Sequence, residues 1–431
     1  MKATVKVIGG GLAGSECALQ LLAAGFGVEM HEMRPIKTTG AHGTDKLAEL
    51  VCSNSLKSEE PTTASGLLKE ELDLCGCRLL ALARECRVPS GSALSVDREK
   101  FSAAVENALK AYEGFTLVRD EVTDIDGTPT VIATGPLTSD SMAQTVGAIS
   151  GKQRLFFYDA IAPIVAADSI NYDKAYFGGR YGKGGDDYLN LPMQRDEYEA
   201  FYKELIGAQS VVLHSFEKSE LFDGCMPIEE MAKRGSDTIR FGPLKPIGLR
   251  NPKTGEKAYA VVQLRRENVA GDCFNLVGFQ TNLTFGEQKR VFSMIPALEN
   301  AEFLRYGVMH RNTYIDAPNV LDERFRVKTS DSPLYIAGQL SGVEGYVESI
   351  MSGMIAGQAM AAELDGKPYE VLSEYTVTGA LCRYVSSCPT DFKPMNANLG
   401  ILPPITDVRD KKLRKQAYHD RAISSIARPI I

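Results

Sequence analysis

The chain has 431 residues, of which 44% are hydrophobic and 24% are charged. These proportions are those of an ordinary globular protein that is long enough for two or three domains, and they argue against a disordered chain. The formal net charge of -7 argues against a protein that coats nucleic acid with its whole surface, so an RNA partner needs a local basic face, and we expect no DNA partner.

The N-terminus and the cysteine content indicate the compartment. Residues 1–8 hold a short apolar stretch that runs into glycines, with neither a signal-peptide pattern nor the roughly 18 apolar residues that cross a bilayer. We therefore expect a cytoplasmic protein with no membrane partner. The nine cysteines form no CxxC pair and the five histidines are scattered, so we expect reduced thiols and no metal site.

A dinucleotide-binding signature opens the chain. The apolar run Val5 to Ile8 is typical of a buried parallel strand, and an apolar helical pattern begins after the glycines that follow it. The GxGxxG loop and the start of the helix give the candidate cofactor-binding residues Gly9, Gly10, Gly11, Leu12, Ala13 and Gly14. In such a loop the first glycine permits the turn, the second lets a pyrophosphate approach the backbone, and the third lets the helix pack on the strand. The phosphates bind at the N-terminus of the helix.

Glu32 is the expected ribose ligand. A second strand, residues 28–32, ends in this acid at close to the spacing of roughly 20 residues that places a carboxylate on the ribose hydroxyls of a dinucleotide. Because FAD and NAD(P) present the same ADP half to the loop, this signature alone leaves both cofactors open.

Two later segments favour FAD. The strand and Ala-Thr-Gly turn of residues 130–136, with Gly135, resemble the segment that two-dinucleotide flavoproteins place over the adenine domain. The strand of residues 334–338 and the helix after it resemble the segment that touches the ribityl-phosphate end of the flavin, which makes Gly338, Gln339 and Tyr346 further candidates. Related flavoproteins often hold Asp at the position of Gln339. Tyr346 fits stacking on the flavin or on an incoming base, and it fits ordinary packing equally well.

The spacing of these segments predicts a discontinuous domain. Because the cofactor segments lie in the first third of the chain and again near residues 335–360, we expect a Rossmann-type α/β FAD-binding domain over residues 1–165 and 306–431. Residues 166–305 change character. A glycine-rich, aromatic stretch and strand-like runs such as residues 258–264 indicate a mixed α/β insertion domain there.

Cys52 and Cys225 have unusual neighbours. Cys52 lies among residues that cap helix starts, and Pro227 fits the first position of a helix that would begin beside Cys225. A helix N-terminus favours the thiolate, which is the nucleophilic form of cysteine. Free cysteines are more often small buried hydrophobes. Both interpretations stay open for these two residues, and we assign the buried role to the other seven.

Six segments together carry a family resemblance. They are residues 7–16, 32–35, 50–55, 222–229, 277–283 and 305–313, of which a generic flavin reductase shares only the first. On these segments the chain resembles TrmFO, the folate- and FAD-dependent tRNA (uracil-5-)-methyltransferase family, over nearly its whole length. The resemblance implies transfer of a methylene carbon from 5,10-methylenetetrahydrofolate to C5 of the T-loop uridine, position 54 of the tRNA. It also implies that FADH2, regenerated by NAD(P)H, supplies the electrons.

The implied reaction gives both cysteines a role. C5 of uracil is a poor nucleophile until a group adds to C6, and a thiolate that adds there leaves enolate character at C5. A second group must then remove the C5 proton. By resemblance, Cys225 is the C6 nucleophile and Cys52 is its partner in proton transfer or in protection of the activated state, although the reverse order also fits.

Two other reactions compete with this interpretation. One is a related flavin- and folate-dependent modification of the wobble uridine of tRNA, and the other is an FAD-dependent NAD(P)H oxidoreductase that acts on a small molecule, with structural cysteines. A tRNA partner needs phosphate contacts. The basic candidates for those contacts are residues 265–266, 289–290 and 411–415 with Arg421 and Arg428. Near the glycine loop, His31, Arg34 and His42 fit either cofactor contact or ordinary polar roles.

Overall fold

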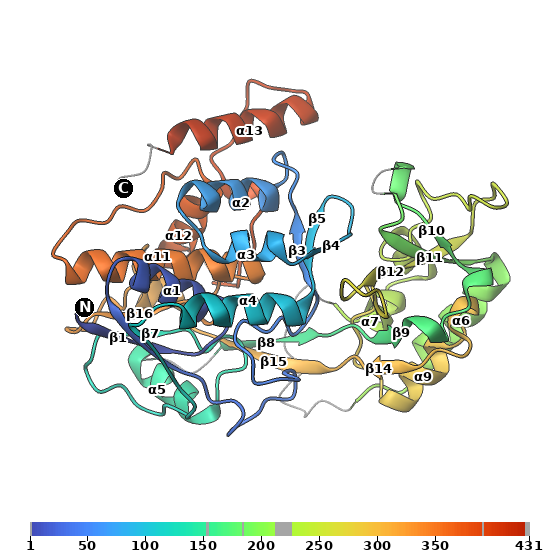
Figure 1. Cartoon of the computed structure of the whole chain (residues 1–431). Helices are drawn as coiled ribbons and strands as arrows, with labels where there is room; N and C mark the ends of the chain where they lie inside the picture. Colours follow the sequence, from blue (N-terminus) through green and yellow to red (C-terminus); the bar gives the residue numbers. More distant parts are fainter. Residues whose placement is uncertain (1, 152–154, 183–184, 212–225, 390–391, 427–431) are drawn as a thin grey trace.

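A computed structural model describes residues 2–151, 155–182, 185–211, 226–389 and 392–426 (Figure 1). Its first sheet is parallel and has five strands in the order β16-β7-β1-β2-β6. The strands are β1 (Thr4–Ile8), β2 (Gly27–His31), β6 (Phe115–Val118), β7 (Thr130–Ile132) and β16 (Leu334–Ile336). β16 comes from the last quarter of the chain and pairs with β7 from the first third. The expected Rossmann-type α/β fold is therefore confirmed.

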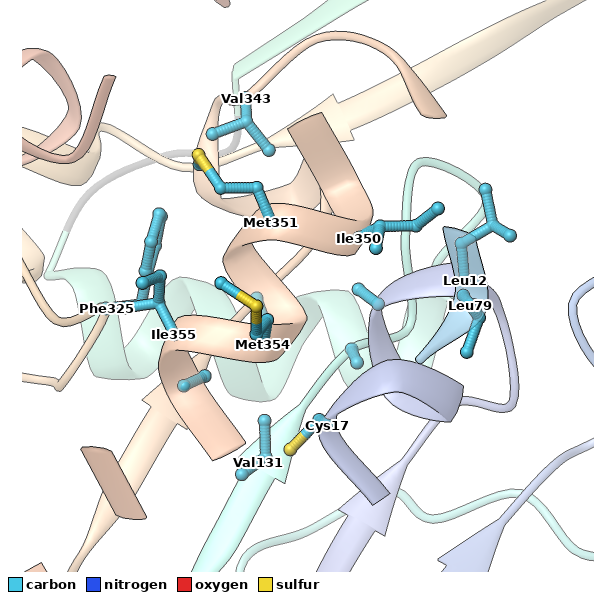
Figure 2. Packing of buried hydrophobic residues seen from close by; sticks show 14 of the residues in the cluster. Leu12, Cys17, Leu79, Val131, Phe325, Val343, Ile350, Met351, Met354 and Ile355 are labelled. Carbon is cyan, nitrogen blue, oxygen red and sulfur yellow. The ribbon is translucent and has the colours of Figure 1, made fainter. Parts of the chain in front are cut away.

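Two helices that contact this sheet pack directly on each other, namely α1 (Leu12–Ala23) and α11 (Tyr346–Leu364). They approach closely because α11 presents Gly353, where a Cβ would lie 2.1 Å from the carbonyl oxygen of Ala13. Figure 2 shows the packing around α11, where Met351, Met354 and Ile355 lie in the first hydrophobic core. This packing fixes the N-terminal ends of both helices, which lie at the carboxyl ends of the strands.

The remaining elements of this part of the molecule surround the sheet. The helices are α2 (Ala64–Leu74), α3 (Leu79–Glu85), α4 (Arg98–Lys110), α5 (Asp140–Ser150), α10 (Ala317–Val320), α12 (Val377–Ser387) and α13 (Lys411–Ser425). A small antiparallel sheet has the order β3-β5-β4, from β3 (Ser55–Ser58), β4 (Arg87–Val88) and β5 (Ala93–Val96). None of the helices in the described ranges is long and apolar enough to cross a membrane.

A second, six-stranded sheet has a core of its own. Its order is β10-β11-β12-β13-β9-β14, from β9 (Ile164–Ala166), β10 (Tyr176–Phe177), β11 (Tyr188–Met193), β12 (Ala260–Arg266), β13 (Cys273–Leu276) and β14 (Phe303–Arg305). Its helices are α6 (Arg195–Gly207), α7 (Ile228–Lys233), α8 (Ser236–Phe241) and α9 (Phe285–Phe292).

A two-stranded antiparallel ribbon joins the two parts, as Figure 1 shows. It pairs β8 (Leu155–Ala160) with β15 (Met309–Tyr314). One strand leads into the second sheet and the other leads back, so the chain enters and leaves this region through the same ribbon. The domain boundaries at residues 165 and 306 stay a prediction.

Candidate cofactor and active site

The glycine loop between β1 and α1 leaves no room for a side chain at two of its positions. Gly9 has a φ of +105°, and a Cβ there would lie 2.4 Å from the carbonyl oxygen of Ala133. At Gly14 a Cβ would lie 1.9 Å from the carbonyl oxygen of Gly9. These contacts hold the turn against β7 and hold α1 against the turn. Both positions therefore require glycine for reasons of packing, as the GxGxxG pattern predicts.

Gly11 has the opposite environment. A Cβ there would meet no protein atom within 4 Å, although the residue lies on the wall of a pocket. Gly11 is the N-cap residue of α1 and has no side chain to cap the first N–H groups of the helix, and Leu12 and Ala13 of that first turn line the same pocket. An open cradle at a helix N-terminus suits a phosphate. The geometry therefore fits the pyrophosphate of a dinucleotide.

Nine of the predicted cofactor residues line this one pocket. They are Gly9, Gly11, Leu12, Ala13, Glu32, Gly135, Gly338, Gln339 and Tyr346. Gly10 and Gly14 lie behind the wall, where the N–H of Gly10 donates to Glu32 and Gly14 packs on the turn. The walls come from β1, β2, β7 and β16, so the pocket runs across the carboxyl edge of the first sheet.

Glu32 is buried and ionised beside the loop. Its Oε2 accepts the N–H of Gly10 at 3.0 Å, and its Oε1 accepts the backbone N–H and Nε of Arg34 at 3.1 and 2.9 Å. Burial alone would raise the pKa of Glu32, but the Arg34 guanidinium and the backbone donors outweigh it and hold the pKa below its ordinary value. The carboxylate keeps lone pairs for further donors, which suits the hydroxyl groups of a ribose.

The far end of the pocket is formed by the segment between β16 and α11. Gly338 has a φ of +77°, and its N–H donates to Ser352 Oγ at 2.7 Å. Gln339 donates through Nε2 to Glu344, so its amide group is held at the pocket wall. Tyr346 begins α11 and lines the same wall. This segment therefore joins the glycine loop in one site although it comes more than 300 residues later.

Tyr346 connects the pocket to Cys52. Its hydroxyl oxygen accepts the N–H of Cys52 at 2.8 Å and that of Ser53 at 3.1 Å. Burial, together with the nearby Cys52 thiol, raises the pKa of Tyr346, so the hydroxyl stays protonated. The Cys52 thiol lies 3.8 Å from the carbonyl oxygen of Ala160 at the end of β8. The Cys52 thiol therefore lies beside the cofactor pocket, whose wall includes the preceding residue, Val51.

The segment around Cys52 is held from both parts of the molecule. Asn54 is fully buried, and its Nδ2 donates to the carbonyl oxygens of Val96 at 3.1 Å and of Arg266 at 2.9 Å. Its Oδ1 accepts Arg265 Nε at 2.8 Å. Arg98 donates to the carbonyl oxygen of Leu50 and, at 2.7 Å, to Glu267. We call these contacts the Cys52 clamp.

Two expectations about this region are wrong. The capping residues around Cys52 predict a helix start, but the chain forms β3 instead, because Ser53 bonds the N–H of Ser55 and Asn54 bonds distant strands. Arg265 was expected among the phosphate contacts. It is 7% exposed and is occupied by Asn54, so it is part of the clamp.

Comparison with known proteins gives the family. The model of the family described as "Glucose inhibited division protein A" (GIDA) matches residues 4–368. A protein from Natranaerobius thermophilus named "Methylenetetrahydrofolate--tRNA-(uracil-5-)-methyltransferase TrmFO" is 52% identical over 419 residues, which cover 97% of this chain and 96% of the relative. A protein of the same name from Bacillus subtilis is 49% identical over 425 residues, or 98% of each chain. The chain belongs to the TrmFO family.

A solved structure agrees with the fold of this TrmFO chain. Aquifex aeolicus GidA matches with a TM-score of 0.70 at 16% identity, over 98% of this chain and 72% of that chain. At this identity the match shows the fold alone, including the arrangement of the parallel sheet and the second sheet.

Three polar residues whose role could not be decided from the sequence lie at the TrmFO cofactor pocket. His31 bonds Glu29 and Asp120, at 2.8 and 2.7 Å. Arg34 bridges Glu32 and Glu49. Burial, with the Arg34 charge nearby, lowers the pKa of His42 to about 4, so this ring is neutral near pH 7. His31, Arg34 and His42 all line the pocket.

The cysteines other than Cys52 include the second predicted catalytic thiol and several buried thiols. Cys225 lies outside the described residues, and α7 begins at Ile228 with Pro227 as its N-cap, one residue later than expected. None of the eight described cysteines forms a disulfide with another described residue. Burial raises the pKa of Cys17, Cys77 and Cys382, which suits the inert role assigned to them. Over the described ranges, no group of three metal-binding side chains is found.

The sequence offered little warning of the residues that form the clamp. Asn54 lies in the segment of residues 50–55 but looks like a capping residue. Arg98 begins α4 and looks like a solvated helix residue, and Glu267 follows the end of β12 among charged neighbours. Only the folded TrmFO chain brings these three side chains to one place.

Proposed function

We propose that this chain transfers a one-carbon unit from 5,10-methylenetetrahydrofolate to C5 of the T-loop uridine of tRNA, which forms 5-methyluridine. The observation that carries the proposal is the near full-length identity of about half the residues to relatives whose names state this methyltransferase activity. The cosubstrates are the folate and NAD(P)H, and the macromolecular partner is the T arm of tRNA. A cytoplasmic location is part of this proposal, and a tRNA substrate supports it.

The pocket fits FAD. The open cradle at Gly11, the ionised Glu32 and the late segment at Gly338 and Gln339 match the pyrophosphate, ribose and ribityl-phosphate regions of the cofactor in order. When bound, FAD supplies the reducing electrons for the methyl group. Tyr346 is the residue of this chain that connects the cofactor pocket to a thiol, because it lines the pocket and holds the backbone of Cys52.

The two cysteines divide the proton and carbon chemistry at the base. We assign the C6 nucleophile to Cys225 and proton transfer at C5, or protection of the activated state, to Cys52. In support of the second role, the Cys52 backbone is fixed by Tyr346, and its thiol is directed at the carbonyl oxygen of Ala160 beside the pocket. The T-loop base must leave its stack to reach this position.

The test uses the FAD-loaded protein, unmodified tRNA, NADPH and labelled methylenetetrahydrofolate, and measures label in 5-methyluridine. Wild type is expected to transfer the label, whereas Cys52→Ala and Cys225→Ala are expected to lose at least about a hundredfold in rate while they keep FAD. A Cys75→Ala variant is the matched control, since this cysteine lies at the end of α2 and does not line the pocket. Label in the wobble uridine, or a complete lack of label in 5-methyluridine while NADPH is still turned over, would overturn the proposal in favour of its two competitors.

The phosphate contacts of the tRNA stay a proposal. Arg290 is engaged by Glu204 and Glu287, which lowers its availability. Lys411, Lys412 and Lys415 on α13 are exposed. Arg421 is directed inward, over the rings of Tyr375 and Tyr418, and Arg428 lies outside the described residues. The exposed lysines of α13 are therefore the better supported of the basic candidates.

A further inference from the structure

Three aromatic rings form a parallel stack at the edge of the second sheet. The ring of Tyr306 lies between those of Phe303 and Phe285, with centroid distances of 5.4 and 4.9 Å and interplanar angles of 10° and 15°. Phe285 is the first residue of α9 and is 55% exposed. The stack therefore ends on a phenyl ring that is open to solvent.

The buried end of the stack packs against the hydrophobic core of the second sheet. Phe303 contacts Phe292 at 6.5 Å between centroids, and Phe292 contacts the fully buried Phe279 at 5.3 Å. Phe292 is itself fully buried. Because this chain of rings supports Tyr306 from behind, Phe285 is held in place before any partner arrives. A ring that is already ordered loses little entropy on binding.

The stack is connected to Cys52 in space through a short series of neighbouring residues. Gly307 follows Tyr306, and a Cβ at Gly307 would lie 2.5 Å from the carbonyl oxygen of Ile161. The N–H of Ile161 donates to Val308 at 2.9 Å, and the next residue back, Ala160, faces the Cys52 thiol. From these steps we place Tyr306 within roughly 15 Å of the thiol. The stack is therefore near enough to the thiol for a single RNA to contact both.

We propose that Phe285, supported by Tyr306, is a stacking platform for an unpaired T-loop base next to the target uridine. The inference rests on the proposed function, because it takes tRNA as the partner. Every base has a flat face that an aromatic ring accepts, and enzymes that flip a base also hold its neighbours. The exposed Lys289 lies one helical turn from Phe285 on the same face of α9, where it meets the phosphate of such a nucleotide.

A second exposed phenyl ring provides the contrast. Phe241 is 58% exposed at the end of α8, but its neighbour over the ring is the Arg240 guanidinium, and among the described residues it belongs to no parallel stack. If exposure alone mattered, Phe241 and Phe285 would be equivalent. Only Phe285 extends an ordered stack toward the solvent near Cys52.

The experiment measures binding and methylation of a T-arm stem-loop RNA by the full-length FAD holoenzyme. We expect Phe285→Ala to raise both the Kd and the KM for the RNA about tenfold with kcat near wild type, because the base loses its stacking partner. Phe285→Trp keeps an aromatic face and is expected to bind like wild type. Phe241→Ala is the matched control and is expected to change neither constant. FAD content and NADPH oxidation without RNA report whether each variant is folded.

Several outcomes would overturn the inference. One is a Kd for Phe285→Ala within about twofold of wild type, and another is an equal loss in Phe241→Ala. A change of Phe285→Ala from dimer to monomer, with unchanged RNA binding, would show that a second copy of the chain covers the ring. Failure of the proposed function reads differently: wild type would transfer no label from the folate, while the binding comparison of the two phenylalanine variants would still be measurable.

Discussion

The cofactor loop and the Cys52 clamp lie side by side but are built by different means. Backbone geometry makes the loop: glycines let β1, α1 and β7 approach within contact distance, and the open space remains at Gly11. Side chains make the clamp, and they come from the Cys52 segment itself, from α4, and from β12 and its end. A local stretch of six residues can therefore specify the first region, whereas the second requires the whole fold.

This difference predicts that the two regions fail separately. Damage to the loop removes the cofactor and leaves the thiol in place. We expect damage to the clamp to leave the cofactor in place and to move the thiol, because Asn54 and Arg98 hold the Cys52 segment and neither of them lines the pocket. The clamp also joins the two sheets, since Arg265 and Glu267 belong to the second sheet or its end and Asn54 to the first part. Loss of the clamp should therefore also change the position of the two parts of the molecule relative to each other.

The largest expected effect comes from Gly11→Ala. The new methyl group meets no protein atom within 4 Å, and Gly11 has a φ of -75° that any residue adopts, so the fold should be unchanged. The methyl group would stand where the pyrophosphate approaches the backbone. We expect FAD affinity to fall on the order of a hundredfold, measured by flavin fluorescence on titration of the apoprotein.

Gly207→Ala controls for the substitution itself. It too would meet no protein atom within 4 Å, but it lies at the end of α6, away from the pocket. Unchanged FAD affinity in Gly11→Ala would show that the cradle does not face the cofactor. A large loss of thermal stability of the Gly11→Ala apoprotein would show that the loop is not open as described.

The next effect comes from Asn54→Ala. Removal of the amide leaves the buried Arg265 guanidinium and the Val96 and Arg266 carbonyl groups without this partner, at a cost of about 2 kcal/mol in the free energy of unfolding. We expect methylation to fall about tenfold as the Cys52 segment shifts, with FAD content unchanged. Label transfer and flavin absorbance measure the two quantities on the same samples.

A surface asparagine provides the comparison for Asn54. Asn319 is exposed and donates only to Asp316, so Asn319→Ala should change neither rate nor stability. If Asn54→Ala lost FAD as readily as activity, the two regions would be one unit and the contrast between them would be wrong.

The sequence predicted what the backbone alone determines. The glycine loop, the strands at 130–132 and 334–336 and Glu32 lie where their patterns indicate, because each pattern is local and repeats across flavoproteins. The clamp escaped prediction because its contacts join residues far apart. Asn54 and Arg265 are 211 positions apart, and Arg98 and Leu50 are 48 apart.

Cys52 shows why local signals mislead in such a place. Serine and asparagine favour helix caps because their side chains bond nearby N–H groups. Here the Asn54 amide bonds carbonyl groups on β12 and on β5, so tertiary contacts replace the local ones and the chain continues as β3. The prediction for Arg265 was wrong for the same reason, since the sequence suggests that a charged residue on a strand lies at the surface unless its buried partner is known.

The smallest expected effect concerns a side-chain contact at the surface, where solvent weakens what the clamp achieves by burial. His419 on α13 bonds Glu70 on α2 at 2.9 Å, and only Ala422 of α13 is fully buried. Burial opposes protonation of His419, but the bonds to Asp420 and Glu70 outweigh it and raise the pKa above its ordinary value of 6.5. The stabilisation is therefore complete below that value and is lost as the pH rises through the raised pKa. We expect the docking of α13 to weaken by no more than about 1 kcal/mol between mildly acidic and mildly alkaline solution, seen as faster hydrogen exchange in α13. His419→Gln should remove this pH dependence, and equal exchange of wild type at both pH values would show that the ion pair contributes nothing to docking.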